Sequence, residues 1–140
     1  MREILYRAKV KDKNELIGKG FPIDENGNLK SEWVFGVPIP HYPDLFLAWN
    51  EACNEYEEVT IIPETIGECV NVSDKNGKKI FEHDIVRIAV CGTYDNYVIS
   101  YDKENARFVV GDTGFTFWSY ISTKIEVIGN VHDNPELLQD

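Results

Sequence analysis

Hydrophobic and polar residues alternate along much of this 140-residue chain, a pattern typical of strands with one buried face. The first such stretch covers residues 3–10, whose apolar alternating positions are Ile4, Tyr6, Ala8 and Val10. A short second strand is expected around residues 15–22. Residues 33–40 form a further β-type run with two prolines, which favour an edge strand or a strand end because proline cannot donate to a sheet ladder.

Residues 44–58 are compatible with two structures. A helix would place Leu45, Trp49, Ala52 and Tyr56 on one face, with Asp44 as its cap. A hairpin would pair residues 45–49 with residues 56–62 around a turn at 50–54. The hairpin is favoured because residues 59–62, Val-Thr-Ile-Ile, are strongly strand-forming and need a partner.

The second half of the chain predicts five short strands separated by turns, which is typical of a small antiparallel SH3-like barrel or a bent sheet. The expected strands are residues 84–90, 97–101, 107–110, 115–121 and 125–131. The Asn-Gly pairs at 26–27 and 76–77 supply the positive φ angles of tight turns, and residues 94–96 are expected to form another turn. Asn134 and Pro135 begin a short terminal helix.

The predicted fold class is therefore mainly β, with N-terminal strands and a hairpin in residues 1–63. The barrel-like or bent sheet and its terminal helix occupy residues 64–140, and the two subdomains together form one domain. No apolar run approaches the roughly 20 residues that a membrane helix needs. The charged N-terminus lacks an apolar signal segment, so we expect a cytoplasmic protein that does not enter a membrane.

The net charge of −10 is concentrated in residues 20–74, which hold one basic and eleven acidic side chains. Phosphate backbones repel such a surface, so we expect no direct binding of nucleic acid. The acidic stretch has two interpretations. It is either a solvated face that aids solubility or a surface for a basic partner, including a mimic of DNA.

No residue pattern indicates a catalytic, cofactor or metal site, and we expect none. The widely spaced cysteines, Cys53, Cys69 and Cys91, are expected to be small buried hydrophobes in a reducing compartment. The three histidines are equally scattered, which argues against zinc. Asp84 stands just before an apolar strand, where aspartate commonly accepts hydrogen bonds from nearby backbone amides, and His83 is expected on the surface of that turn.

The aromatic run at residues 115–120 is the candidate interface. Phe115 and Phe117 share one strand face and are expected in the core, whereas Trp118 and Tyr120 share the other face. Since aromatic side chains anchor protein interfaces, Trp118 and Tyr120 are candidates for contact with another subunit. The alternative is that the N-terminal subdomain covers them.

Two segments together resemble the YopX family of phage and prophage proteins. They are residues 62–67, Ile-Pro-Glu-Thr-Ile-Gly, and residues 74–86, Asp-Lys-Asn-Gly-Lys-Lys-Ile-Phe-Glu-His-Asp-Ile-Val. Residues 1–8, 33–36 and 126–138 are also similar to family segments. Two departures stand out, since residues 68–72 replace the family's usual Gln-aromatic-Thr-Gly-Leu run and His83 replaces its usual glycine. That glycine suggests a turn with permissive backbone angles, so His83 implies that this chain tolerates a side chain there.

The resemblance implies a small, mostly β protein of a phage or prophage, cytoplasmic in the infected bacterium and prone to self-assembly. It carries over no catalytic residues. Its recurrent positions are turn and strand-start residues, here Asn76, Gly77, Asp84 and Gly129. We therefore expect a non-enzymatic accessory protein of unknown biochemical function that forms homo-oligomers and contacts a host or phage protein. The alternative is an acidic inhibitor or DNA mimic directed at a host nucleic-acid-binding protein.

Overall fold

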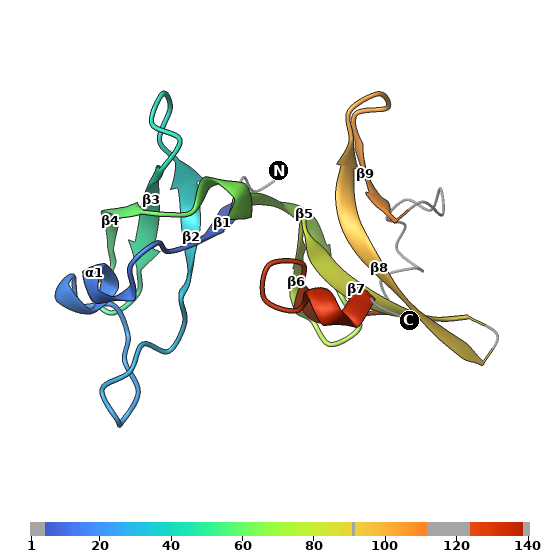
Figure 1. Cartoon of the computed structure of the whole chain (residues 1–140), viewed down its shortest axis with the longest axis horizontal. Coiled ribbons are helices and arrows are strands. Elements are labelled where there is room, and N and C mark those ends of the chain that lie inside the picture. Colours follow the sequence, from blue (N-terminus) through green and yellow to red (C-terminus); the bar gives the residue numbers. More distant parts are fainter. Residues whose placement is uncertain (1–4, 91, 112–123, 139–140) are drawn as a thin grey trace. The chain divides into compact units, whose positions relative to one another are not determined.

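The computed structural model describes residues 5–90, 92–111 and 124–138, and these residues form a mainly β structure (Figure 1). The chain divides into two compact units, which we call the N-terminal unit, Ile4–Glu68, and the C-terminal unit, which holds the chain from Cys69 onward. The division lies a few residues beyond the boundary expected after residue 63.

The N-terminal unit is built on a curled antiparallel sheet with the strand order β4-β3-β2-β1. Its elements are β1 (Tyr6–Lys9), helix α1 (Lys13–Gly18), β2 (Trp33–Pro38), β3 (Leu45–Asn50), β4 (Glu55–Thr60) and the 3₁₀ turn η1 (Pro63–Thr65). Strands β3 and β4 pair from Leu45↔Thr60 to Asn50↔Glu55. The favoured hairpin is thus confirmed, and the helical alternative is wrong.

Two local predictions for this unit need correction. Residues 15–22 do not form a strand, because Asp12 caps helix α1 by accepting a hydrogen bond from the Asn14 amide at 2.9 Å, and Leu16 of that helix is buried in the core. Strand β2 is not an edge strand, since it lies between β1 and β3. Its Pro38 is the last residue of the strand, so the strand-end alternative holds.

The core of the N-terminal unit lies on one face of the sheet, which we call the inner face. The chain segment that follows β4 returns beside the segment that follows β1 and is hydrogen-bonded to it. The Lys11 amide donates to the Thr60 carbonyl at 3.1 Å, and the Ile62 amide donates to the Lys9 carbonyl at 2.9 Å. The enclosed side chains are Ala8, Val10, Leu16, Phe21, Val34, Phe46, Ala48, Val59 and Ile61. The side chains on the opposite, outer face of the same strands therefore point away from this core.

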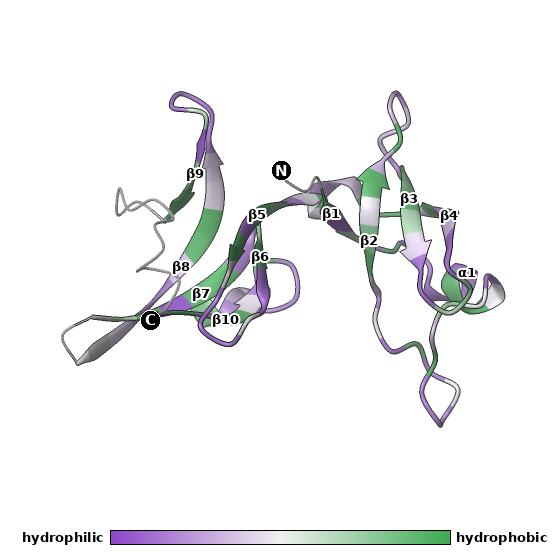
Figure 2. Ribbon diagram, turned by 180° about the vertical axis from the view of Figure 1, so that it is seen from behind, coloured by the Kyte–Doolittle hydropathy of each residue, from purple (hydrophilic) through white to green (hydrophobic). Residues whose placement is uncertain are grey.

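The C-terminal unit contains a four-stranded antiparallel sheet with the order β10-β7-β8-β9. Its strands are β7 (Asp84–Val90), β8 (Thr93–Asp102), β9 (Arg107–Val110) and β10 (Ile125–Asn130). Strand β5 (Gly67–Ser73) pairs first with β1 and then, within this unit, with β6 (Lys79–Phe81). Figure 2 shows hydrophobic residues on β7 and β8, and the buried cluster consists of Ile80, Val86, Ile88, Ile99, Val110 and Ile125.

Four of the five strands expected in this half correspond to β7 through β10, and the fifth, residues 115–121 with Trp118 and Tyr120, lies outside the described residues. The described strands form an open sheet, not a closed barrel. Residues 94–96 belong to β8, so the turn expected there is wrong: β7 and β8 stay paired as far as Val90↔Thr93. The expected terminal helix is the 3₁₀ turn η2 (Pro135–Leu138).

The cysteines differ in their surroundings. Cys69 is 3% exposed in β5, as expected of a small core residue. Cys53 is exposed in the turn between β3 and β4, so the prediction of burial is wrong for it. Its position follows from the tight hairpin, whose turn residues project away from the core. Cys91 lies outside the described residues.

Candidate functional site

The family-like segment that begins at Asp74 forms a carboxylate-anchored turn. One oxygen of Asp74, Oδ1, accepts hydrogen bonds from the Asn76 and Lys78 amides, both at 2.9 Å. Gly77 has a φ of 83°, the left-handed region that glycine adopts at little cost. Residues 24–28 build the same turn, since Asp24 accepts from the Asn26 and Asn28 amides. The Asp-x-Asn-Gly pattern is therefore explained by the hydrogen bonds that nearby backbone amides donate to the aspartate.

Asp74 differs from Asp24 because it also binds a distant strand. Its Oδ2 accepts a hydrogen bond from the Val127 amide of β10 at 2.9 Å, and the neighbouring Lys75 amide donates to the Ile125 carbonyl at 2.9 Å. Burial raises the pKa of Asp74, but the hydrogen bonds from Val127, Lys78 and Asn76 outweigh it and hold the pKa below its usual value. The ionised carboxylate thus joins the turn to β10.

His83 lies in the turn between β6 and β7, and Asp84 is the first residue of β7. Asp84 is 1% exposed, and its Oδ2 accepts a hydrogen bond from the Phe81 amide at 2.8 Å, the geometry that a turn-fixing aspartate requires. His83 has a φ of 76°, in the left-handed region that glycine adopts at little cost, so the turn does have the permissive backbone angles that the family resemblance suggested. The His83 amide donates to the Ile99 carbonyl at 2.8 Å, and its carbonyl accepts from the Val131 amide at 3.0 Å.

Gly129 provides space for a neighbouring side chain. A Cβ atom at this position would lie 2.5 Å from Oδ1 of Asn134. That oxygen accepts the Asn130 amide at 3.2 Å, while Oδ1 of Asn130 accepts the amides of His132 and Asp133, each at 3.0 Å. The four predicted motif positions, Asn76, Gly77, Asp84 and Gly129, thus occupy a turn, the start of β7 or the end of β10.

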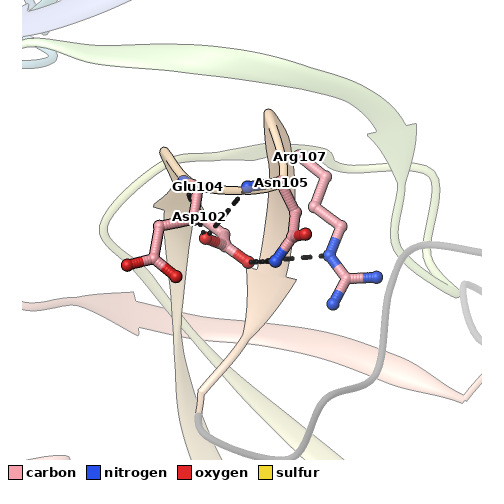
Figure 3. Close-up of polar contacts among 4 residues, drawn as sticks. All are labelled: Asp102, Glu104, Asn105 and Arg107. Atoms are coloured by element: carbon pink, nitrogen blue, oxygen red, sulfur yellow. Dashed lines mark hydrogen bonds and ion pairs between the residues drawn. The ribbon is translucent and has the colours of Figure 1, made fainter.

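A third carboxylate-anchored turn joins β8 to β9 (Figure 3). Asp102 accepts hydrogen bonds from the backbone amides of Glu104 and Asn105 and from the Asn105 side chain, the last at 2.7 Å. Nε of Arg107 lies 3.7 Å from Oδ2 of Asp102. The Asn105 side-chain hydrogen bond is the main reason why the pKa of Asp102 lies below its usual value. This exposed turn needs no function beyond connecting two strands.

The outer face of the N-terminal sheet carries a group of aromatic side chains that the sequence analysis missed. We call Trp33, Phe35, Trp49 and Tyr56 the aromatic face. Because Gly36 pairs with Ala48 and both are buried, Phe35 and Trp49 project together from the other side of β2 and β3. Trp49 pairs with Tyr56 on β4, with ring centroids 5.0 Å apart. Alternation with the buried Val34 and Ala48 is the sequence signal that could have identified the face.

The aromatic face is accessible despite its apolar character. Phe35 is 42%, Trp49 41% and Tyr56 56% exposed. The Arg7 guanidinium lies 4.9 Å from the centroid of the Trp33 ring, a cation–π contact at one side of the face. Next to these rings is a pocket of about 190 Å³, whose lining includes Phe21, Lys30, Trp33, Phe35, Trp49 and Glu51. A pocket of this size admits one protruding side chain but is smaller than typical cofactor sites.

Comparison with known proteins identifies the family. A family model described as "YopX protein" matches residues 5–139. The chain belongs to the YopX family. The resemblance stated from the two motif segments is therefore confirmed, and in this YopX chain those segments form η1, the Asp74 turn and the turn before β7.

A solved structure shares the YopX fold described here. Protein EF1440 from Enterococcus faecalis is 23% identical and aligns with a TM-score of 0.52, covering 99% of this chain and 100% of that chain. At this identity the likeness concerns the fold alone. A search of curated proteins finds no match. In the described part of the chain, every helix is too short or too polar to cross a lipid bilayer.

Proposed function

We propose that this YopX protein is a non-enzymatic accessory protein of a phage or prophage that acts in the bacterial cytoplasm through self-association and protein contacts. Family membership supports the phage origin, because the resemblance to YopX proteins implies it. The observation that carries the proposal is the row of Phe35, Trp49 and Tyr56 exposed on adjacent strands. Clustered exposed aromatics beside a pocket are typical of protein interfaces, in which they supply most of the binding energy.

The register of the aromatic face favours a second copy of this chain as the partner. Phe35, Trp49 and Tyr56 stand side by side at one level of the sheet, because Gly36 pairs with Ala48 and Trp49 pairs with Tyr56. A two-fold axis parallel to the strands would place β2 of one copy opposite β4 of the other and would keep each residue at its own level along the strands. The aromatic row of one copy would then pack against the same row of the other in reverse order, so the face is complementary to itself.

Light scattering on the full chain tests this proposal. The wild-type protein at about 50 µM is expected to be an oligomer, and the double variant Phe35→Thr, Trp49→Thr is expected to be a monomer. Threonine preserves strand propensity, so circular dichroism should show a folded protein. The control is Tyr94→Thr, which removes an aromatic residue that is 68% exposed on β8 of the C-terminal unit and should leave the oligomer intact.

A monomeric wild-type protein would refute self-association. An oligomer that survives the Phe35 and Trp49 substitutions but dissociates in the variant Trp118→Ala, Tyr120→Ala would refute the role of the aromatic face. It would place the interface on the aromatic run predicted at residues 115–120.

A second candidate function is inhibition of a basic, nucleic-acid-binding host protein. It rests on the excess of acidic side chains in residues 20–74, of which Glu51, Glu55 and Glu58 are exposed at the β3–β4 hairpin. Asp74 makes no contribution to such a surface because its carboxylate is buried in a turn. Host proteins retained by the wild type but lost from a variant with glutamine at positions 51, 55 and 58 would support inhibition. Retention by both forms, or by neither, would reject it.

A further inference from the structure

Two histidines that are far apart in the sequence meet in the C-terminal unit. Nε2 of His132 lies 3.4 Å from Nδ1 of His83, and the two rings are nearly perpendicular, with an interplanar angle of 84°. His83 stands in the turn before β7, and His132 follows β10. The two residues are 49 positions apart, so their sequence spacing gave no sign of this contact.

The backbone holds both histidines firmly. The His83 carbonyl accepts the Val131 amide at 3.0 Å, so the segment that carries His132 is bonded directly to the turn that carries His83. The His132 amide donates in turn to Oδ1 of Asn130 at 3.0 Å. The two ring nitrogens therefore face each other in a preorganised arrangement, whereas the side chain of His83 remains 28% exposed and open to an ion from solvent.

The separation of the nitrogens matches a pair of metal ligands better than a hydrogen bond. Hydrogen bonds from N–H groups usually have donor–acceptor distances of about 2.7–3.2 Å, shorter than the 3.4 Å observed. Two histidine nitrogens at about 2.05 Å from a tetrahedral Zn²⁺ lie about 3.3 Å apart. We propose that His83 and His132 form a two-histidine site for a divalent first-row transition-metal ion such as Zn²⁺, with water completing the coordination.

Glu82 places a negative charge beside the site. Its Oε2 lies 3.8 Å from Nε2 of His83, the ring nitrogen that points away from His132. This charge would attract a divalent cation to the two histidines. The bound ion would connect the β6–β7 turn to the segment after β10.

Calorimetric titration of the metal-free full chain with Zn²⁺ tests the site. The wild type is expected to bind one ion, and both His132→Gln and His83→Gly are expected to weaken binding at least tenfold. Glycine tolerates the φ of 76° at position 83, so His83→Gly should fold at least as well as the wild type. Lost binding together with an unchanged or raised melting temperature in the absence of metal would then report the missing ligand and not misfolding.

Two controls distinguish this site from other donors. His41→Asn removes the remaining histidine, which is exposed and has a φ of 71°, and should leave Zn²⁺ binding unchanged. A variant with Cys53→Ser and Glu55→Gln disrupts the exposed group of Cys53, Glu55 and Glu57 and should also bind as the wild type does. Wild-type affinity in either pair variant, loss of binding in either control, or no binding by the wild type would overturn the proposal.

Discussion

Replacing Gly129 with alanine tests whether this family-motif glycine is required for space. The Cβ of the new alanine would meet three atoms of Asn134 at 2.5–3.0 Å, so the Asn134 side chain must move and lose its hydrogen bond to the Asn130 amide. Overpacking costs about 1–3 kcal/mol and the lost hydrogen bond about 1 kcal/mol. The stiffer unfolded chain offsets about 0.4–1 kcal/mol of this. We expect Gly129→Ala to lower the free energy of unfolding by about 2 kcal/mol.

A double-mutant cycle separates this steric cause from any other. Asn134→Ala alone removes the acceptor of the Asn130 amide and should cost about 1 kcal/mol. The double variant Gly129→Ala, Asn134→Ala loses the two closest contacts and keeps only the one with Cβ of residue 134 at 3.0 Å, so its free energy of unfolding should lie within about 1 kcal/mol of that of Asn134→Ala. Urea unfolding followed by circular dichroism measures all four proteins.

Two results would refute the reasoning about Gly129. One is a decrease of less than about 0.5 kcal/mol in the free energy of unfolding of Gly129→Ala, because the structure would then accommodate the new methyl group without cost. The other is additivity, with a loss of about 3 kcal/mol in the double variant, because the cost of the methyl group would then not depend on Asn134.

Three further predictions concern the turns of the C-terminal unit. Gly77→Ala should lower the free energy of unfolding in urea by about 1 kcal/mol because of the φ of 83° alone, since no atom would crowd the new Cβ. Gly77→Asn should lower it clearly less, and equal losses in the two variants would contradict this explanation. The depressed pKa of Asp74 contributes stability above the ordinary aspartate pKa of about 4, and this stability is lost as the pH falls through the folded value. Melting temperatures measured from pH 7 to pH 2.5 should therefore fall less in Asp74→Asn than in the wild type, and parallel curves would argue against the carboxylate. Without metal, His83→Gly should raise the free energy of unfolding by about 1 kcal/mol, and a decrease would show that the His83 side chain stabilises the turn by more than its strain.

The candidate surface and the metal site depend on different units of the chain. The aromatic face belongs to β2, β3 and β4 of the N-terminal unit, whereas the histidine pair lies in the C-terminal unit. Substitutions at Phe35 and Trp49 should therefore leave Zn²⁺ binding unchanged, and His83→Gly should leave the oligomeric state unchanged. Each proposal can fail without affecting the other.

The amino-acid sequence by itself determined the local features of this protein. The turns at Asp24 and Asp74 were predictable because their hydrogen bonds join residues no more than four positions apart. Alternation of apolar residues predicted β1 and β7, and the strand-forming residues 59–62 predicted the β3–β4 hairpin. The role of Asp84 also followed from local chemistry, because its partner, the Phe81 amide, is three residues away.

Only the tertiary structure decided which distant residues meet. Helix α1 forms where a strand was expected, with Leu16 buried in the core and Glu15 bonded to the Thr60 amide at 2.7 Å. The aromatic face depends on the register of three strands, and the contact between His83 and His132 depends on β10 pairing with β7. Strand register is set by contacts between residues far apart in the chain, and a shift by one residue would turn each side chain to the opposite face.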